Sequence, residues 1–120
     1  MIGKAILRKG YIYIEHEYVS SVADVLQRIE DAAILIKDGA PHRLLVDARY
    51  FHRTWQPEQG GTIVDAVRHS LPEDTRIALM LSPEIPAHAR PVLGGLKAAG
   101  WQVGHFTQED EALTWLLATD

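Results

Sequence analysis

Five polar or aromatic side chains follow a short apolar run at residues 44–46 and form the densest such group in the chain: Asp47, Arg49, His52, Arg53 and Trp55. Ligands of open α/β sheets bind beyond the carboxyl ends of the strands, and the forked donors of arginine suit anionic or flat ligands. We therefore predict that these five residues bind a ligand. Two alternatives stay open: Asp47 caps a backbone turn with Arg49 as its surface partner, or Asp47, Arg49 and His52 form the catalytic group of an enzyme.

No arrangement of residues is typical of nucleophilic catalysis or phosphate transfer. The chain has no cysteine, and its four serines stand where helix caps or turns are expected. Gly60-Gly61-Thr62 precedes a predicted helix, but it lacks the lysine and the spacing of a phosphate-binding loop. We expect no catalytic residues, no cofactor and no enzymatic activity.

Histidines are scattered along the chain rather than paired. None stands four residues from another, which is the spacing of metal-binding helices. His16 and His105 lie on predicted strands and would meet only if those strands are neighbours. We expect no metal site. The six histidines are His16, His42, His52, His69, His88 and His105.

Length and composition predict one globular domain covering residues 1–120. The chain has 12 basic and 16 acidic residues, a net charge of -4 and 47% hydrophobic residues. Its slight acidity argues against a nucleic-acid partner, because such proteins usually carry a basic stripe. No apolar run reaches the roughly 18–20 residues of a transmembrane helix. Without a secretion signal or cysteine, we expect a cytoplasmic protein.

Hydrophobic periodicity places the first elements. Residues 4–18 are typical of a β-hairpin with a turn at Lys9-Gly10. Ser21 and Asp24 form a capping-box pattern that opens a helix, which Gly39 ends by a left-handed cap. Residues 44–46 predict a strand covered on both faces, and residues 48–61 predict an irregular loop. Thr62 is expected to cap the next helix, which closes before Pro72.

The second half repeats the alternation of strand and helix. Residues 77–81 predict another buried strand, and three prolines between 83 and 91 form a stiff connector. A helix is expected to start between Ala87 and Pro91, to contain Gly94-Gly95 and to end at Gly100. Residues 101–106 predict a strand, and a capping-box variant starting at Thr107 opens the last helix.

This order, ββαβαβαβα, predicts an α/β fold with a mixed five-stranded sheet and four helices. The N-terminal hairpin is antiparallel, and the remaining strands are parallel because helices connect them. The fold depends on one arrangement above all. The strands at 44–46 and 77–81 should lie side by side and run in the same direction.

Three segments of the chain resemble a known family. Residues 100–116 join a strand ending on phenylalanine, an acidic capped turn and an Ala-Leu-x-Trp-Leu helix. Leu44-Leu45-Val46-Asp47-Ala48-Arg49 and Arg76-Ile77-Ala78-Leu79-Met80 match the family's central strands. In this order they resemble the SpoIIAA-like family of small bacterial proteins. Its fold is the STAS fold, named for sulfate transporters and anti-sigma factor antagonists.

The resemblance implies a STAS-like domain with a non-enzymatic binding or regulatory role. Antagonists of this fold are switched by phosphorylation of a serine in an Asp-Ser-Ser-Gly-type turn. The matching segment here, residues 51–58, reads Phe-His-Arg-Thr-Trp-Gln-Pro-Glu and has no serine. The resemblance therefore does not extend to that switch.

Two further expectations concern binding. The fold is similar to CRAL-TRIO lipid-binding domains, which implies an alternative role as a carrier of a small apolar or lipid-like ligand. Its pocket would lie under the proline-rich connector and a helix softened by Gly94-Gly95. The aromatic residues Tyr11, Tyr13 and Trp115 are candidates for a protein interface, including a homodimer.

Overall fold

A single mixed sheet organises the computed structural model, which describes residues 4–15, 19–49, 52–53, 59–83 and 89–118. Its strand order is β1-β2-β4-β6-β7. The β1/β2 pair is antiparallel and the other pairs are parallel. This confirms the predicted α/β class and element order, and the topology is consistent with a STAS-like fold. The strand bounds are β1 (Lys4–Arg8), β2 (Tyr11–Glu15), β4 (Arg43–Asp47), β6 (Arg76–Met80) and β7 (Gln102–Phe106).

The central pair, β4 and β6, lies as predicted. Leu45 of β4 stands opposite Ala78 of β6 in a parallel register, and neither side chain is exposed. Leu44 and Ile77, one step along, face the opposite side of the sheet and are also buried. Both faces of the sheet are covered at this point, which is why these strands are continuously apolar rather than alternating.

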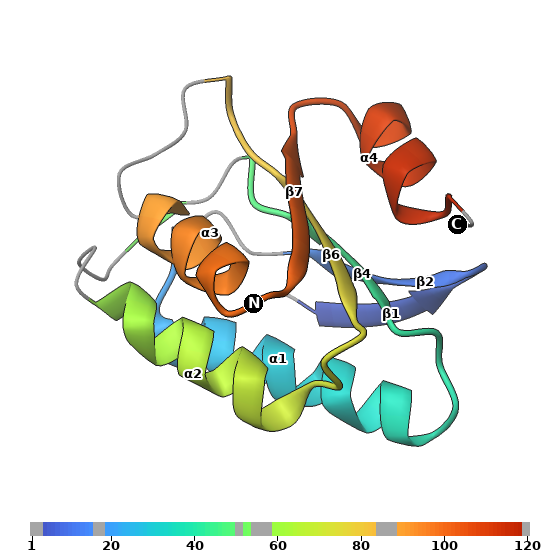
Figure 1. The fold of residues 1–120 in the computed structure, drawn as a ribbon, viewed down its shortest axis with the longest axis horizontal. Helices are drawn as coiled ribbons and strands as arrows, with labels where there is room; N and C mark the ends of the chain where they lie inside the picture. The colour runs from blue at the N-terminus through green and yellow to red at the C-terminus, as the bar shows by residue number, and fades with distance from the viewer. Residues whose placement is uncertain (1–3, 16–18, 50–51, 54–58, 84–88, 119–120) are drawn as a thin grey trace.

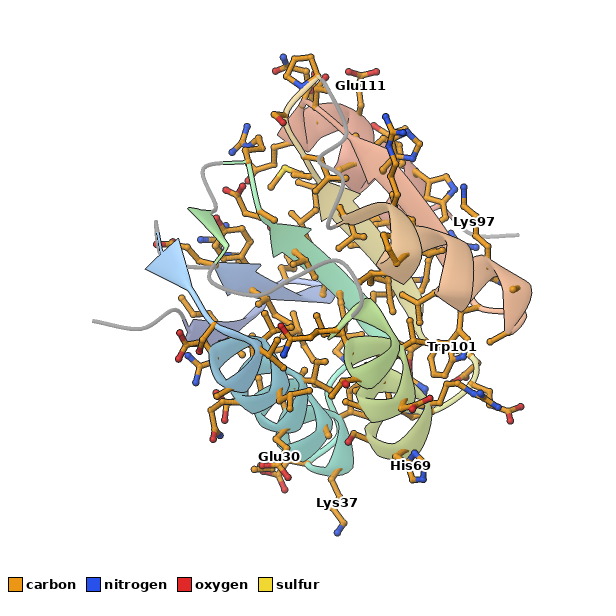
Figure 2. All side chains as sticks on the ribbon, turned by 90° about the vertical axis from the view of Figure 1, so that its left-hand side faces the viewer. Glu30, Lys37, His69, Lys97, Trp101 and Glu111 are labelled. Carbon is orange, nitrogen blue, oxygen red and sulfur yellow. The ribbon has the colours of Figure 1, made fainter. Side chains whose placement is uncertain are left out.

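Four helices lie on the sheet in the described ranges: α1 (Val22–Lys37), α2 (Gly60–Ser70), α3 (Ala89–Ala98) and α4 (Glu109–Leu116). The first three cover one face and α4 covers the other (Figure 1). Exposed charged residues such as Glu30, Lys37 and Glu111 point outward from the helices (Figure 2). None of these helices is long and apolar enough to cross a bilayer.

The start of α1 confirms the predicted capping box. The Asp24 backbone N–H donates to Ser21 Oγ at 3.2 Å, and the Ser21 N–H donates to Asp24 Oδ2 at 3.1 Å. The helix ends at Lys37 with Asp38 as its C-cap, and Gly39 follows with a φ of 105° that favours glycine. Local sequence signals therefore mark both ends of this helix: side-chain capping at its start and a glycine in the left-handed conformation after its end.

Two predicted helix starts are wrong. α2 begins at Gly60, two residues before Thr62, and its first turn packs closely on α3: a Cβ on Gly60 would lie 3.0 Å from Pro91 Cβ. α4 begins at Glu109 with Gln108 at the N-cap, so Thr107 does not cap it. Here the Asp110 side chain accepts a hydrogen bond from the next backbone N–H, at 3.0 Å.

A short second sheet was not predicted. β3 (Val19–Ser20) pairs in parallel with β5 (His52–Arg53), which falls inside the segment expected to be a loop. Two-residue strands are too short to show a period of two in the sequence. The pairing ties the segment after β2 to the segment after β4, at the same edge of the main sheet.

Gly94 and Gly95 differ in their surroundings. Nothing lies within 4 Å of a Cβ built on Gly94, whereas a Cβ on Gly95 would lie 2.8 Å from Val64 Cγ2 of α2. Gly95 therefore lets α2 and α3 approach closely, a packing role that differs from the flexible flap expected from the sequence.

Candidate functional site

Asp47 ends β4 on the face of the sheet covered by α4, and both of its oxygens accept hydrogen bonds. Arg49 donates from its backbone N–H and Nε to Oδ1, at 3.2 and 3.0 Å, and from Nη2 to Oδ2 at 3.1 Å. The Tyr13 hydroxyl donates to Oδ2 at 3.1 Å. The guanidinium of Arg8 lies 4.0 Å above the Tyr13 ring. These contacts connect β1, β2 and the end of β4.

The electrostatics of this group follow from its burial. Burial raises the pKa of Asp47, but hydrogen bonds and charge from Arg49 outweigh that effect, so the pKa lies below its usual value. Burial, followed by the charge of Asp47, raises the pKa of the Tyr13 hydroxyl to about 12. Asp47 is therefore an ionised acceptor at neutral pH, and Tyr13 is a neutral donor to it.

The five residues predicted to bind a ligand are only partly placed together. Asp47 and Arg49 contact each other, as the turn-capping alternative predicts. His52 and Arg53 form β5, and only their backbone lies within the described structure. Trp55 lies outside the described residues. A ligand at this group stays a prediction.

The candidate interface residues pack within the chain. Tyr11 and Tyr13 expose 8% and 7% of their surface and belong to the core under α4. Trp115 is partly buried at the edge of that core, as its place on the helix predicts. The homodimer stays a prediction, and the two tyrosines have little surface to offer it.

Local contacts account for the position of Trp115. Its ring centroid lies 5.6 Å from that of Phe106 and 5.3 Å from the Arg76 guanidinium. Arg76 Nη1 also donates to the carbonyls of Trp115 and Ala118, at 2.9 and 3.0 Å, at the carboxyl end of α4. A Cβ on Gly104 would lie 3.0 Å from Phe106, so the glycine makes room for both rings.

The histidines do not meet as considered from the sequence. β2 and β7 are separated by β4 and β6, so the strand that carries His105 is not a neighbour of the hairpin, and His16 lies outside the described residues. His42 Nδ1 lies 2.7 Å from Asp74 Oδ1 at the surface. No three His, Asp or Glu side chains gather into a metal site among the described residues.

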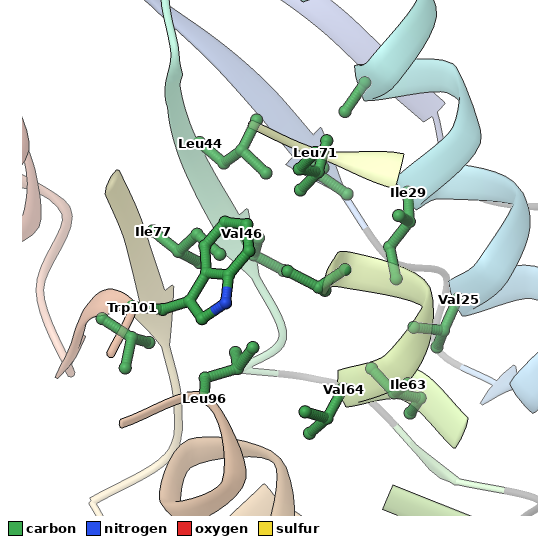
Figure 3. Packing of buried hydrophobic residues seen from close by; sticks show 14 of the residues in the cluster. Val25, Ile29, Leu44, Val46, Ile63, Val64, Leu71, Ile77, Leu96 and Trp101 are labelled. Carbon is green, nitrogen blue, oxygen red and sulfur yellow. The ribbon is translucent and has the colours of Figure 1, made fainter. Parts of the chain in front are cut away.

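An apolar cavity of about 110 Å³ lies on the opposite face of the sheet, under α1, α2 and α3. Several of the side chains around it, including Val25, Val46 and Ile63, converge from different elements in Figure 3. The cavity reaches Ala48 and Leu81, directly beyond the carboxyl ends of β4 and β6. Among the described residues, its lining is Ile14, Val25, Arg28, Ile29, Leu44, Val46, Ala48, Ile63, Val67, Leu71, Ile77, Leu79, Leu81, Ala89, Val92 and Leu96.

Arg28 is the one charged residue among the described residues of this lining, and it was not among the residues predicted from the sequence. Its side chain is 5% exposed, and it lies with Val25 and Ile29 on the buried stripe of α1. The sequence contains a pattern that indicates its position, because residues 25, 28, 29 and 32 share one face of the helix. A charged residue on an apolar stripe marks a buried polar contact.

Comparison with protein-family models, with curated proteins and with solved structures finds no match to this chain. The likeness to the STAS fold is therefore one of topology, and the site must be judged by its own geometry.

Proposed function

We propose that this chain is a non-enzymatic binding module of the SpoIIAA-like type that holds a small apolar molecule in the cavity under α1, α2 and α3. One observation carries the proposal. Fifteen of the sixteen described residues that line the cavity are aliphatic, and the cavity extends along the sheet to the carboxyl ends of β4 and β6. These ends are where α/β sheets bind ligands.

The volume of the cavity limits the size of the ligand. Cavities of about 150 Å³ lined by aliphatic and aromatic side chains bind benzene or xenon. A volume of about 110 Å³ therefore suits a group of about four to six carbon atoms rather than a whole lipid. Filling such a volume with apolar atoms contributes about 2 to 3 kcal/mol, at about 24 cal/mol per Å³.

The Asp47 group supports a ligand less well. Both carboxylate oxygens of Asp47 accept hydrogen bonds from Arg49 or Tyr13, so a ligand would have to replace contacts within the chain. A carboxylate with an arginine and a tyrosine as donors is a stable structural link between strands. We therefore assign binding to the apolar cavity and a structural role to this group.

The test introduces a leucine into the cavity at Ala89, a buried lining residue on α3. Xenon and 1-butanol are titrated into isotope-labelled protein, and amide and methyl chemical shifts are followed by NMR. We expect saturable shifts around the cavity in the wild type and their loss in Ala89→Leu. Ala98→Leu makes the same change at an exposed position of the same helix and should leave binding unchanged.

Two results would contradict the proposal. The absence of saturable shifts with either probe in the wild type would show that the cavity takes no small apolar molecule. Equal binding to the wild type and Ala89→Leu would place the probes elsewhere on the protein.

A further inference from the structure

One large apolar side chain lies exposed on the outer face of α1. Ile34 is 58% exposed, the highest value among the large hydrophobic residues that the structure describes. It borders an open groove between the carboxyl ends of α1 and α2, and the other apolar residues of this groove are Ala33, Ile36, Leu71 and Pro72. An exposed apolar patch with a polar rim is typical of a surface that another protein covers.

Two opposite charges flank Ile34 on the same face of the helix. Glu30 lies four residues before it and Lys37 three residues after it, which places all three on one stripe. Both charged side chains are exposed and project from the same side of α1 in Figure 2. Neither has an ion-pair or hydrogen-bond partner among the described residues, whereas the neighbouring Asp31 is paired with Arg28. The stripe therefore carries an acid, an apolar centre and a base in that order along the helix.

This order is complementary to itself when a second copy of the helix runs in the opposite direction. Consider two α1 helices related by a two-fold axis that passes between Ala33 and Ile34. Glu30 of each copy then faces Lys37 of the other copy. The same axis places Ile34 opposite Ala33, whose small side chain leaves room for it. Because the contact is isologous, each dimer contains two such charge pairs.

We propose that this face of α1 is the interface of a homodimer, with Ile34 at its centre and the charge pairs at its rim. The partner is a second copy of this chain, because α1 itself supplies the reversed order of charges that the stripe requires. Tyr11 and Tyr13, the aromatic residues considered for this role, are buried under α4 on the other face of the sheet. The inference does not depend on the proposed function of the cavity.

Sedimentation equilibrium of the full chain, from micromolar to millimolar concentration, measures the dissociation constant of the dimer. We expect the wild type to dimerise in this range and Ile34→Ser to be monomeric. Glu30→Lys or Lys37→Glu should raise the dissociation constant about tenfold, because each replaces two attractive pairs by two repulsive ones. The double variant restores both pairs with their signs reversed and should return to the wild-type value.

Mixing the two single variants gives the sharpest result. One copy then carries two lysines on the stripe and the other carries two glutamates, so an equal mixture of Glu30→Lys and Lys37→Glu should form a heterodimer. Each variant alone should remain mostly monomeric at the same concentration. Circular dichroism melting shows that every variant is folded before its association is measured.

Three control variants make the matching changes at other exposed positions. Glu111→Lys on α4 and Lys97→Glu on α3 change the net charge by the same amounts, and Lys97 also lies in the last turn of its helix. Leu7→Ser removes the other large apolar side chain that is strongly exposed, at 52%. All three should leave the dissociation constant unchanged.

The proposal fails if the wild type is monomeric over the whole concentration range, whatever other molecule this face might contact. It also fails if a wild-type dimer is unaffected by Ile34→Ser and by both charge reversals, because the interface then lies elsewhere. Equal effects of Glu30→Lys and Glu111→Lys would attribute the change to net charge and contradict the proposed pairing. Binding of xenon and 1-butanol decides the cavity proposal separately from these results.

Discussion

Replacing each of two adjacent glycines by alanine tests how closely α2 and α3 pack. Gly94 and Gly95 both lie inside α3, where alanine is favoured over glycine by about 1 kcal/mol. Gly94 has open space around its missing Cβ, whereas a Cβ on Gly95 would lie 2.8 Å from Val64 Cγ2. Gly94→Ala and Gly95→Ala therefore change helix propensity equally, but only Gly95→Ala introduces a steric conflict.

The expected magnitudes follow from those surroundings. Gly94→Ala should raise the free energy of unfolding by about 1 kcal/mol, which is about 4 °C in melting temperature for a chain of 120 residues. Gly95→Ala has the same gain but adds overpacking, which costs about 1 to 3 kcal/mol. Its net effect should lie between no change and a loss of about 2 kcal/mol.

Urea unfolding of the two single variants measures this difference, and Val64→Ala provides the rescue. In the Val64→Ala background the conflicting methyl group is absent, so Gly95→Ala should become stabilising. A double-mutant cycle should give a coupling of about 1 to 3 kcal/mol between the two positions. If Gly95→Ala stabilises the wild type as much as Gly94→Ala does, the close packing inferred for α2 and α3 is wrong.

Two smaller predictions concern the titration of the Asp47 group and a buried hydroxyl. The raised pKa of Tyr13 means that the stability it contributes is fully present below pH 10 and is lost as the pH rises from 10 to about 12. Asp47→Asn should move the pKa of Tyr13 down toward 10. The pKa is measured by tyrosinate absorbance, with Tyr13→Phe identifying the signal of Tyr13. An unchanged pKa in Asp47→Asn would exclude the charge of Asp47 as a cause of the shift. The pKa of Asp47 is lower in the folded protein than its ordinary value, so ionised Asp47 stabilises the fold at every pH above that ordinary pKa. This contribution is lost as the pH falls through the folded pKa. Asp47→Asn should therefore flatten the acid limb of the curve of stability against pH. Thr75 is fully buried and its Oγ1 has no hydrogen-bond partner among the described residues, so Thr75→Val should raise the free energy of unfolding by about 1 kcal/mol. A loss of that size in thermal or urea unfolding would show that the hydroxyl is bonded.

The fold was predictable because its strongest signals are local. The apolar runs at 44–46 and 77–81 had no polar face, which is typical of strands between two layers of helices, and they pair in the structure. The α1 start was predictable for the same reason, since Ser21 and Asp24 are only three residues apart. The starts of α2 and α4 were not, because neither helix has a side-chain hydrogen bond at its N-cap and so neither start carries that local signal.

The candidate site was predictable only in part. The sequence pointed to the carboxyl end of β4, and the cavity does reach Ala48 there. It did not show that Asp47 and Ala48, which are adjacent in the chain, lie on opposite faces of the sheet, Asp47 with Tyr13 and Ala48 at the cavity. The sequence places Arg28 on the apolar face of α1 with Val25 and Ile29, but only the packing shows that its side chain stays buried there instead of extending to solvent.

The two faces of the sheet differ in a way that bears on function. Under α4, the polar groups of Tyr13, Asp47 and Arg49 satisfy one another and hold neighbouring strands together. Under α1, α2 and α3, the aliphatic lining leaves a cavity, and Gly95 brings α3 close to α2 beside it. Stability and binding are therefore assigned to opposite faces. Substitutions at Asp47 should lower stability without changing the affinity for 1-butanol, whereas Ala89→Leu should abolish that affinity.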